Sequence, residues 1–245
     1  MAPSARSPAA AMIPPGHPAA LALERGGLDA AGDLVDDCRA CDLWARATQG
    51  VFGEGSRNAR LMLVGEQPGD REDLAGRPFV GPAGRVLDEA LEDAGIDRAD
   101  TFVTNAVKHF KWKARGKKRL HDKPNREQVK ACRPWLELEE ELVRPEIMVL
   151  LGATAAQAIL GSAFRVTVDH GKLLEPERPG GPRRLATLHP SAILRARTPE
   201  DREELRRTLV SDLTVAAGSL TARRVQGPPS GDPRAARPTG SGAPG

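Results

Sequence analysis

The sequence predicts an α/β fold: a single doubly wound domain with a central, mostly parallel four-stranded sheet flanked by helices. Four runs are nearly continuously apolar, which is typical of strands that are covered on both faces in a parallel sheet. Patterns with helical spacing alternate with these runs, as they do in doubly wound domains. The predicted strands are "RLMLVGE" (60–66), "TFVTNAV" (101–107), "EIMVLLG" (146–152) and "RLATLHP" (184–190).

Helices are expected between and after these strands. In the first of them, apolar residues recur at the three- and four-residue spacing of a helix face. The second should be bent or interrupted at Pro134, because proline lacks the backbone N–H that a helix interior needs. The expected helical ranges are 81–95, 125–143, 152–161 and 199–217.

The 245 residues are enough for one sizeable core, with some length to spare. Proline breaks up the N-terminal sequence, and the C-terminal sequence is rich in proline, glycine and arginine. Such compositions are typical of segments that do not fold. We therefore expect disordered tails over residues 1–27 and 219–245, on either side of a domain that spans residues 28–218.

Charge and composition exclude few partners but do exclude some classes of protein. The net charge of +3 is too small to indicate a partner, because 36 cations nearly cancel 33 anions. No apolar run approaches the roughly 20 residues that cross a bilayer, and the N-terminus lacks a secretory apolar core. Three cysteines in such a chain do not make a disulfide framework. A soluble, cytoplasmic, monomeric protein is expected.

Polar or ionisable residues follow each predicted strand directly. In doubly wound folds ligands bind beyond the carboxyl ends of the strands. The sequence therefore predicts an active site along one edge of the sheet. The four strand ends read "GEQPGD" (65–70), "NAVKH" (105–109), "GAT" (152–154) and "HPS" (189–191).

The segment "GEQPGDREDLAGRPFVGPAG" (65–84) is rich in glycine and proline and lies between a strand and a helix. It matches neither a phosphate-binding P-loop nor the dinucleotide fingerprint. A long, well-capped loop with its charges in solvent would explain most of it. Against that reading, Glu66 and Gln67 follow an apolar strand directly, where a carboxylate would be partly desolvated.

The "CRAC" sequence places Cys38 and Cys41 at a spacing common in metal sites. Cys132 lies far along the chain, so a fourth ligand is needed, and His109 is the best candidate by position and chemistry. The spacing alone does not separate zinc from an iron–sulfur cluster. A chance CxxC sequence with a buried free Cys132 is the alternative.

Two histidines stand in chemically suggestive positions. "KWKARGKKRLH" (111–121) places six cations in eleven positions and ends on His121. A solvated loop explains the charge but not the histidine. "LHPSAILR" (188–195) places His189 at a strand end. A single histidine there is more often structural than catalytic, so its neighbours must decide.

Together these segments resemble the uracil-DNA glycosylase superfamily over about residues 35–215. The 65–84 segment resembles the water-activating and uracil-stacking segment of the family 4 enzymes, "VTNAVKH" (103–109) their uracil-recognising strand, and "LHPSAILR" their DNA-loop histidine motif. Two departures are similar to the UdgX subgroup, which stays covalently attached to DNA through a histidine. They are the inserted basic "ARGKKRLH" (114–121) and Glu-Gln where most family 4 members have Glu-Ala.

The resemblance implies a role for each pocket residue. Uracil would be flipped out of the DNA stack, with Phe79 stacked on its ring and Asn105 hydrogen-bonded to its edge. His189 would stabilise the negative charge that develops on uracil O2. The remaining residues that the motifs imply in substrate binding are Gln67, Asp70 and Ser191.

The resemblance also implies an unusual nucleophile. His121 would take the place of the attacking water and bond to the deoxyribose, with Glu66 accepting its ring proton. The cations Lys117, Lys118 and Arg119 would hold DNA phosphates, although a plain solvated loop remains the alternative for these three.

A 4Fe–4S cluster is implied as cofactor, and the expected substrate is uracil-containing DNA, in single strands. The cluster would pin the N-terminal segment to the sheet. An ordinary hydrolytic uracil-DNA glycosylase and a catalytically silent iron–sulfur module that binds DNA remain alternatives. The implied cluster ligands are Cys38, Cys41, His109 and Cys132.

Overall fold

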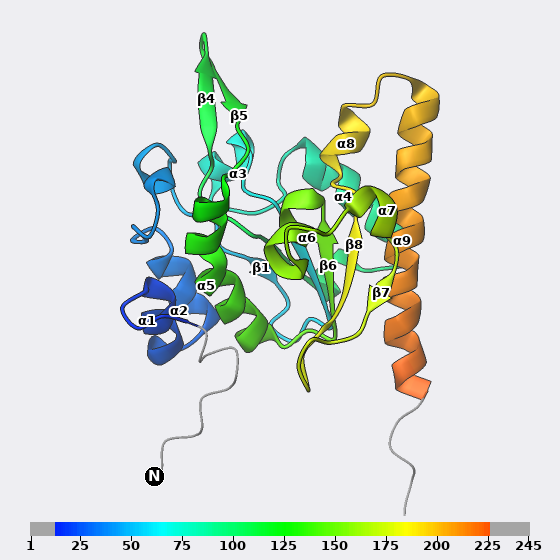
Figure 1. Ribbon diagram of the computed structural model, residues 1–245, viewed down its shortest axis with the longest axis horizontal. Helices are drawn as coiled ribbons and strands as arrows, with labels where there is room; N and C mark the ends of the chain where they lie inside the picture. Colours follow the sequence, from blue (N-terminus) through cyan, green and yellow to red (C-terminus); the bar gives the residue numbers. More distant parts are fainter. Residues whose placement is uncertain (1–12, 226–245) are drawn as a thin grey trace, which may run out of the picture.

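The structure, a computed structural model, describes residues 13–225 (Figure 1). Its centre is a six-stranded sheet with the order β1-β3-β2-β6-β8-β7. The four predicted strands form its parallel centre, and two-residue antiparallel strands extend both edges. The prediction of four strands therefore missed the two edge strands, because a strand of two residues is too short to show a hydrophobic pattern. The strands are β1 (Glu54–Gly55), β2 (Leu61–Gly65), β3 (Thr101–Asn105), β6 (Ile147–Leu151), β7 (Leu173–Leu174) and β8 (Arg183–Thr187).

Helices cover both faces of the sheet, as a doubly wound domain requires. Leu61 and Leu63 of β2 pack toward one face, with α4, α8 and α9, whereas Met62 and Val64 pack toward the other, with α5, α6 and α7. This alternation is the two-residue period of a strand that is buried on both sides. The helices are α4 (Pro82–Asp93), α5 (Arg126–Val143), α6 (Ala153–Leu160), α7 (Val166–Asp169), α8 (Ser191–Leu194) and α9 (Pro199–Val225).

Helix α5 begins with a capping box, in which the side chains of Asn125 and Gln128 each accept a hydrogen bond from the other residue's backbone N–H. Of the expected bend or interruption at Pro134, the interruption is absent, because the helix is continuous through this residue. Trp135 and Leu138, which follow the proline, are fully buried. Their packing keeps the helix against the core despite the missing donor.

The N-terminal boundary of the domain lies earlier than predicted. Helix α1 (Pro18–Arg25) falls inside the expected tail, and its Ala19 and Ala22 are fully buried in one cluster with Trp135 of α5. Helix α2 (Leu28–Leu34) packs in the same cluster through Ala31. Apolar packing therefore attaches this segment. At the other end, α9 continues to Val225, past the expected boundary at residue 218. Residues 1–12 and 226–245 of the expected tails lie outside the described residues.

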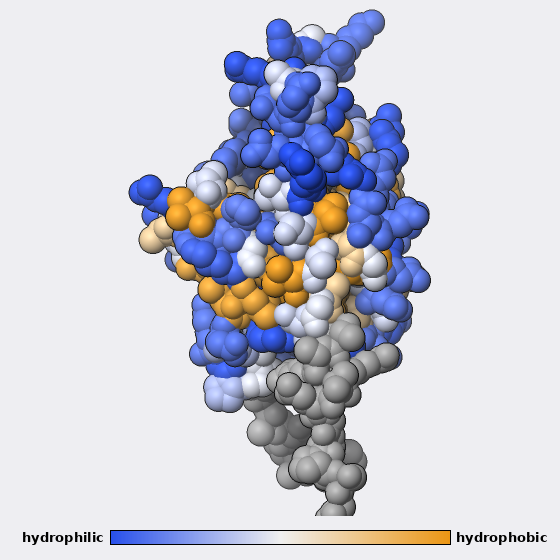
Figure 2. All heavy atoms as spheres, turned by 90° about the vertical axis from the view of Figure 1, so that its right-hand side faces the viewer, coloured by the Kyte–Doolittle hydropathy of each residue, from blue (hydrophilic) through white to orange (hydrophobic). Residues whose placement is uncertain are grey.

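The basic segment expected as a loop is a β-hairpin. Strands β4 (Trp112–Arg115) and β5 (Lys118–His121) pair antiparallel, with Trp112 opposite His121. Gly116 lies in the turn with a φ of 58°, a conformation that glycine adopts readily. The hairpin projects beyond the carboxyl edge of the sheet (Figure 1), and Figure 2 shows the projecting end as hydrophilic. Helix α3 (Asp70–Ala75) lies beside it.

No helix among residues 13–225 is long and apolar enough to span a membrane.

A buried ion pair lies behind the carboxyl end of β3. Lys108 and Glu139 are both fully buried, with the Lys108 Nζ 2.8 Å from the Glu139 Oε2. The ammonium group also donates to the Thr104 hydroxyl and to the backbone oxygen of Asn105, at 2.6 and 2.8 Å. Glu139 further accepts the backbone N–H of Gly53. Every charge here has several partners, which is what makes such burial tolerable.

Breaking this pair should be costly. Lys108→Met leaves the Glu139 carboxylate buried without its cation, so we expect the free energy of unfolding in urea to fall by about 3–5 kcal/mol. The double variant Lys108→Met/Glu139→Leu removes both charges and should recover much of that loss. A loss below about 1 kcal/mol in the single variant would contradict the assignment, because it would match an exposed ion pair.

Candidate active site

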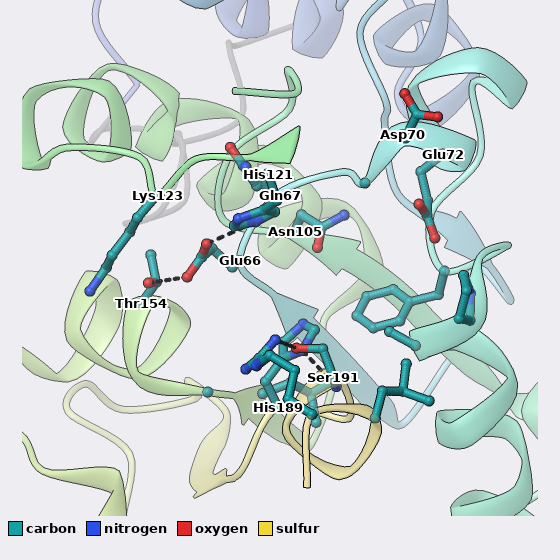
Figure 3. A pocket seen from close by; sticks show the side chains of 18 of the residues that line it. Glu66, Gln67, Asp70, Glu72, Asn105, His121, Lys123, Thr154, His189 and Ser191 are labelled. Atoms are coloured by element: carbon teal, nitrogen blue, oxygen red, sulfur yellow. Dashed lines mark hydrogen bonds and ion pairs between the residues drawn. The ribbon is translucent and has the colours of Figure 1, made fainter. Parts of the chain in front are cut away.

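The carboxyl ends of the four central strands surround a cavity of about 880 Å³ (Figure 3). The chain runs from β2 to β3 on one side and from β6 to β8 on the other, so the connections leave the neighbouring strands β2 and β6 in opposite directions. Ligand sites of doubly wound sheets form at such a switch point. The cavity receives side chains from all four strand ends and from the hairpin, among them Glu66, Phe79, Asn105, His121, Thr154 and His189.

Glu66 lies at the centre of this site, directly after β2. Its Oε1 is 3.1 Å from the Nε2 of His121, and its Oε2 accepts a hydrogen bond from the Thr154 hydroxyl (Figure 3). Burial would raise the pKa of Glu66. The hydrogen bonds from His121 and Thr154, with the charges of His121 and His189, outweigh burial and lower it below its usual value. The carboxylate is therefore ionised at neutral pH.

Gln67 lines the cavity, but its side-chain amide bonds to the backbone of the hairpin. Its amide nitrogen donates to the backbone oxygens of Lys111 and Asp122, both at 3.1 Å, and its amide oxygen accepts the Lys111 N–H at 3.1 Å. These two residues begin and end the hairpin segment. The predicted substrate-binding side chain therefore has its hydrogen-bonding groups engaged in closing the base of the hairpin, and it is nearly fully buried.

Arg119 also holds the hairpin in place. Its guanidinium pairs with Asp70 and Asp73 of α3, at 2.6 and 2.5 Å. Asp73 is fully buried, and it also accepts hydrogen bonds from Thr48. Arg119, predicted to hold phosphate, and Asp70, predicted to bind substrate, are thus paired with each other.

Lys117 and Lys118 lie at the exposed turn of the hairpin. They are the two predicted DNA-binding cations that keep the solvent exposure which a phosphate contact needs.

Phe79 and Asn105 are brought together by a glycine. A Cβ atom on Gly65 would lie 2.4 Å from the Asn105 Oδ1 and 2.6 Å from the Phe79 Cζ, so only glycine allows both side chains to approach the end of β2. Phe79 has a φ of 56°, which is strained for so bulky a residue. Glu72 secures this strained turn by accepting the Gly81 N–H at 2.7 Å.

His189 is fixed by the residues that follow it. The Ser191 backbone N–H donates to its Nδ1 at 3.1 Å, and the Ser191 hydroxyl lies 2.7 Å from the same nitrogen. Because Nδ1 accepts, the proton of the neutral ring lies on Nε2. The Arg195 guanidinium donates to the Ser191 hydroxyl oxygen at 2.8 Å, which directs the hydroxyl proton toward His189. Burial lowers the pKa of His189 to about 4, so the ring is a neutral donor at neutral pH.

The expected metal ligands gather near the N-terminal helices. Cys38 and Cys132 are buried in one apolar cluster, with Cys41 packed against it. His109 is also buried, and this burial lowers its pKa. The charges of Asp36 and Arg39, which stand on either side of Cys38 in the sequence, also affect the pKa of His109. A hydrogen bond from the Cys132 thiol lowers the pKa of Cys41 to about 7.

Among residues 13–225, no three His, Cys, Asp or Glu side chains converge closely enough to hold one metal ion. A mononuclear zinc site, whose ligands all lie within about 2.3 Å of one ion, is therefore not preformed. The ligands of a 4Fe–4S cluster bind different iron atoms and need not converge on one point. Three thiols that pack in or against one apolar cluster, with a buried imidazole, fit the donor set of such a cofactor.

Thr154 and Lys123 are among the lining residues that were not assigned from the sequence. Thr154 contacts Glu66, and its only sequence signal was the "GAT" strand end. Lys123 lines the cavity as an exposed cation directly after the hairpin. Nothing local distinguishes Lys123 from other surface lysines, because its relevance comes from where the hairpin ends.

The neutral state of His189 makes the stability of the protein depend on pH. The unfolded ring takes up a proton below about pH 6.5, whereas the folded ring stays neutral until about pH 4. The unfolded state thus binds more protons in this window, and stability is lost as pH falls.

Between pH 6.5 and 5, the free energy of unfolding of the parent should fall by about 2 kcal/mol more than that of a His189→Gln variant. Urea unfolding at each pH measures this difference. Equal slopes for the two proteins would contradict the buried, neutral assignment.

Comparisons with known proteins agree with this site. Residues 52–214 match the uracil DNA glycosylase superfamily. The type-4 uracil-DNA glycosylase of Thermotoga maritima is 36% identical over 190 residues, which cover 77% of this chain and 92% of that protein. The type-4 enzyme of Pyrobaculum aerophilum is 38% identical over 168 residues, 66% of this chain and 82% of that protein. That of Archaeoglobus fulgidus is 36% identical over 185 residues, 72% and 88% of the two chains. This chain therefore belongs to the uracil-DNA glycosylase superfamily, and it is an enzyme of that class, a DNA N-glycosylase.

Proposed function

We propose that this glycosylase excises uracil from DNA and then bonds covalently to the abasic deoxyribose through His121. The observation that carries the proposal is the 3.1 Å contact between His121 and Glu66 at the edge of the cavity. An imidazole at this point occupies the space from which a water molecule would otherwise attack the sugar. The hairpin that carries it is anchored by Gln67 and Arg119.

Uracil recognition falls to Phe79 and Asn105. A flipped base can stack on the aromatic ring, and an amide can pair with a carbonyl and an imide N–H of uracil together. Cytosine presents an amino group and an unprotonated ring nitrogen on the same edge. An Asn105 amide oriented for uracil would then meet mismatched groups, which is how a site built for hydrogen bonding rejects a close analogue.

Departure of the base separates charge across the cavity. The bond between uracil N1 and the sugar C1′ breaks with its electron pair moving to the base, where negative charge gathers on O2. The neutral His189 offers its Nε2–H to that oxygen. The ionised Glu66 stabilises the positive charge on the sugar from the other side. Neither role needs a proton transfer before the bond breaks.

His121 then completes the reaction. Its ring nitrogen that faces away from Glu66 keeps a lone pair, which forms a bond to C1′ as the cation develops. The ring proton on the Glu66 side passes to the carboxylate, so the product is a neutral alkylated imidazole. This product contains no good leaving group, and the protein stays attached. The departing uracil anion gains its proton from solvent.

Lys117 and Lys118 are the cations best suited to hold DNA phosphates, because both are exposed at the hairpin turn and neither forms an ion pair among residues 13–225. A single strand is the substrate that needs no unpairing before the base is flipped. Uracil-containing single-stranded DNA is therefore the proposed partner.

We also propose that Cys38, Cys41, His109 and Cys132 hold a 4Fe–4S cluster. Its donors come from the N-terminal segment, from the connection between β3 and the hairpin, and from α5. Bound there, it would supply a cross-link between these three segments and no redox step. Their apolar packing supports the segments independently of the cluster.

Replacement of His121 should separate the two halves of the reaction. His121→Ala is expected to lose the adduct but to keep some uracil release, because water can enter the vacated space. The measurement is a denaturing gel of the protein with single-stranded DNA that carries one deoxyuridine. A band that resists heat and detergent reports the adduct, and cleavage after alkali reports uracil release.

If the parent protein releases uracil without forming a resistant band, the enzyme is an ordinary hydrolytic glycosylase. A His121→Ala variant that crosslinks as well as the parent would identify a different nucleophile. Intact DNA in all lanes would indicate a protein that only binds DNA.

The cluster assignment predicts the metal content. The purified parent should contain about four iron and four sulfide per chain and absorb near 400 nm, whereas Cys132→Ser should lose most of both. Zinc in place of iron, or full iron content in Cys132→Ser, would contradict the proposed ligand set.

A further inference from the structure

The "GAT" turn (152–154) at the carboxyl end of β6 has no role in the chemistry described above. Thr154, in the first turn of α6, is nearly fully buried and lines the cavity. Its hydroxyl donates to the Oε2 of Glu66, and Figure 3 shows Glu66 lying between Thr154 and His121. The two oxygens of one carboxylate thus have different partners.

This division matters because a carboxylate can rotate about its terminal bond. Terminal torsions of this kind have broad, shallow preferences, so the side chain alone does not fix which oxygen faces His121. A hydrogen bond to one oxygen fixes the plane of the group and thereby the direction of the other. The Thr154 hydroxyl supplies that bond from an element that does not carry His121.

The position of the hydroxyl is itself well determined. Threonine is β-branched and has few χ1 rotamers in a helix. The start of α6 is tied to the sheet, because the Gly152 N–H donates to the Thr187 oxygen at 2.8 Å. A Cβ on Gly152 would lie 2.9 Å from the His189 Cβ, so this turn also passes close to the second catalytic histidine.

The beginning of α6 adds a favourable field. The N-terminus of a helix carries partial positive charge, which stabilises a nearby carboxylate. Glu66 has a lowered pKa despite its burial, and the Thr154 hydrogen bond is among the causes. Both effects keep the group ionised and ready to accept the proton of His121.

We propose that Thr154 is a positioning residue, which holds one oxygen of Glu66 so that the other is aimed at His121. The inference rests on the proposed role of His121. It assigns to the β6–α6 turn the orientation of the dyad that forms the adduct.

The test compares Thr154→Val, which keeps the shape and removes the hydroxyl, with Thr154→Ser, which keeps the hydroxyl. Single-turnover adduct formation on deoxyuridine-containing single-stranded DNA is followed from pH 4.5 to 8. A hydrogen bond to a charged group corresponds to a rate effect of about 10- to 100-fold. We expect Thr154→Val to slow adduct formation by that factor, with its acid limb moved to higher pH, and Thr154→Ser to restore most of both.

The half-buried Thr208 of α9, whose hydroxyl bonds within its own helix, is the matched control. Thr208→Val should leave the rate and the pH profile unchanged. A Thr154→Val protein with the parent rate and profile would overturn the inference. So would a Thr154→Ser protein as slow as Thr154→Val, because the effect would then come from packing and not from the hydroxyl.

A second measurement is independent of the adduct. Carboxyl ¹³C NMR of the free protein, with the Glu66 signal assigned from Glu66→Gln, gives the pKa of Glu66 directly. It should be higher in Thr154→Val than in the parent, and an unchanged value would overturn the inference. A parent that forms no adduct but shows this difference would reject the role of His121 and retain the Thr154–Glu66 interaction.

Discussion

The carboxylate of Glu66 connects three separate parts of the chain, and the site depends on it. It follows β2, one of its oxygens meets His121 on the hairpin, and the other meets Thr154 on α6. These residues are far apart in the sequence. A parallel sheet brings them together because it places the carboxyl ends of all its central strands along one edge. The same edge supplies Asn105 and His189, so one topological constraint assembles both the proposed uracil pocket and the proposed nucleophile.

Electrostatics decides whether the hairpin can present His121 at all. Six cations in eleven residues repel one another, and a free segment of this composition would sample many conformations. Asp70 and Asp73 neutralise Arg119, and Gln67 closes the base through three hydrogen bonds to the backbone. The conformational entropy of the hairpin is thus already lost in the free protein, before DNA binds. In the proposed reaction, a nucleophile that is already held in place gains the large advantage of intramolecular attack.

The central sheet and several pocket residues could be predicted from the sequence, because apolar runs and strand-end polar residues are local patterns. The partners of those residues could not. Gln67 was assigned to substrate, but its hydrogen bonds join positions 44 and 55 residues away. The hairpin was expected as a loop, since its charged positions obscure the alternation of a strand. Helix α1 was missed because its sequence is short and follows closely spaced prolines, whereas its packing on Trp135 comes from a distant part of the chain.

Two residues with proposed catalytic roles, His189 and Glu66, are in different charge states at neutral pH. Burial keeps His189 neutral, whereas hydrogen bonds keep the partly buried Glu66 ionised. A neutral donor on one side and a fixed negative charge on the other create a field in the direction in which charge separates when the base leaves the sugar. A protonated His189 would bind a uracil anion more strongly, but it would also pair with Glu66 and weaken the stabilisation of the sugar cation. The Ser191 N–H, which donates to Nδ1 of His189, disfavours protonation of that ring and so leaves Glu66 without a second cationic partner.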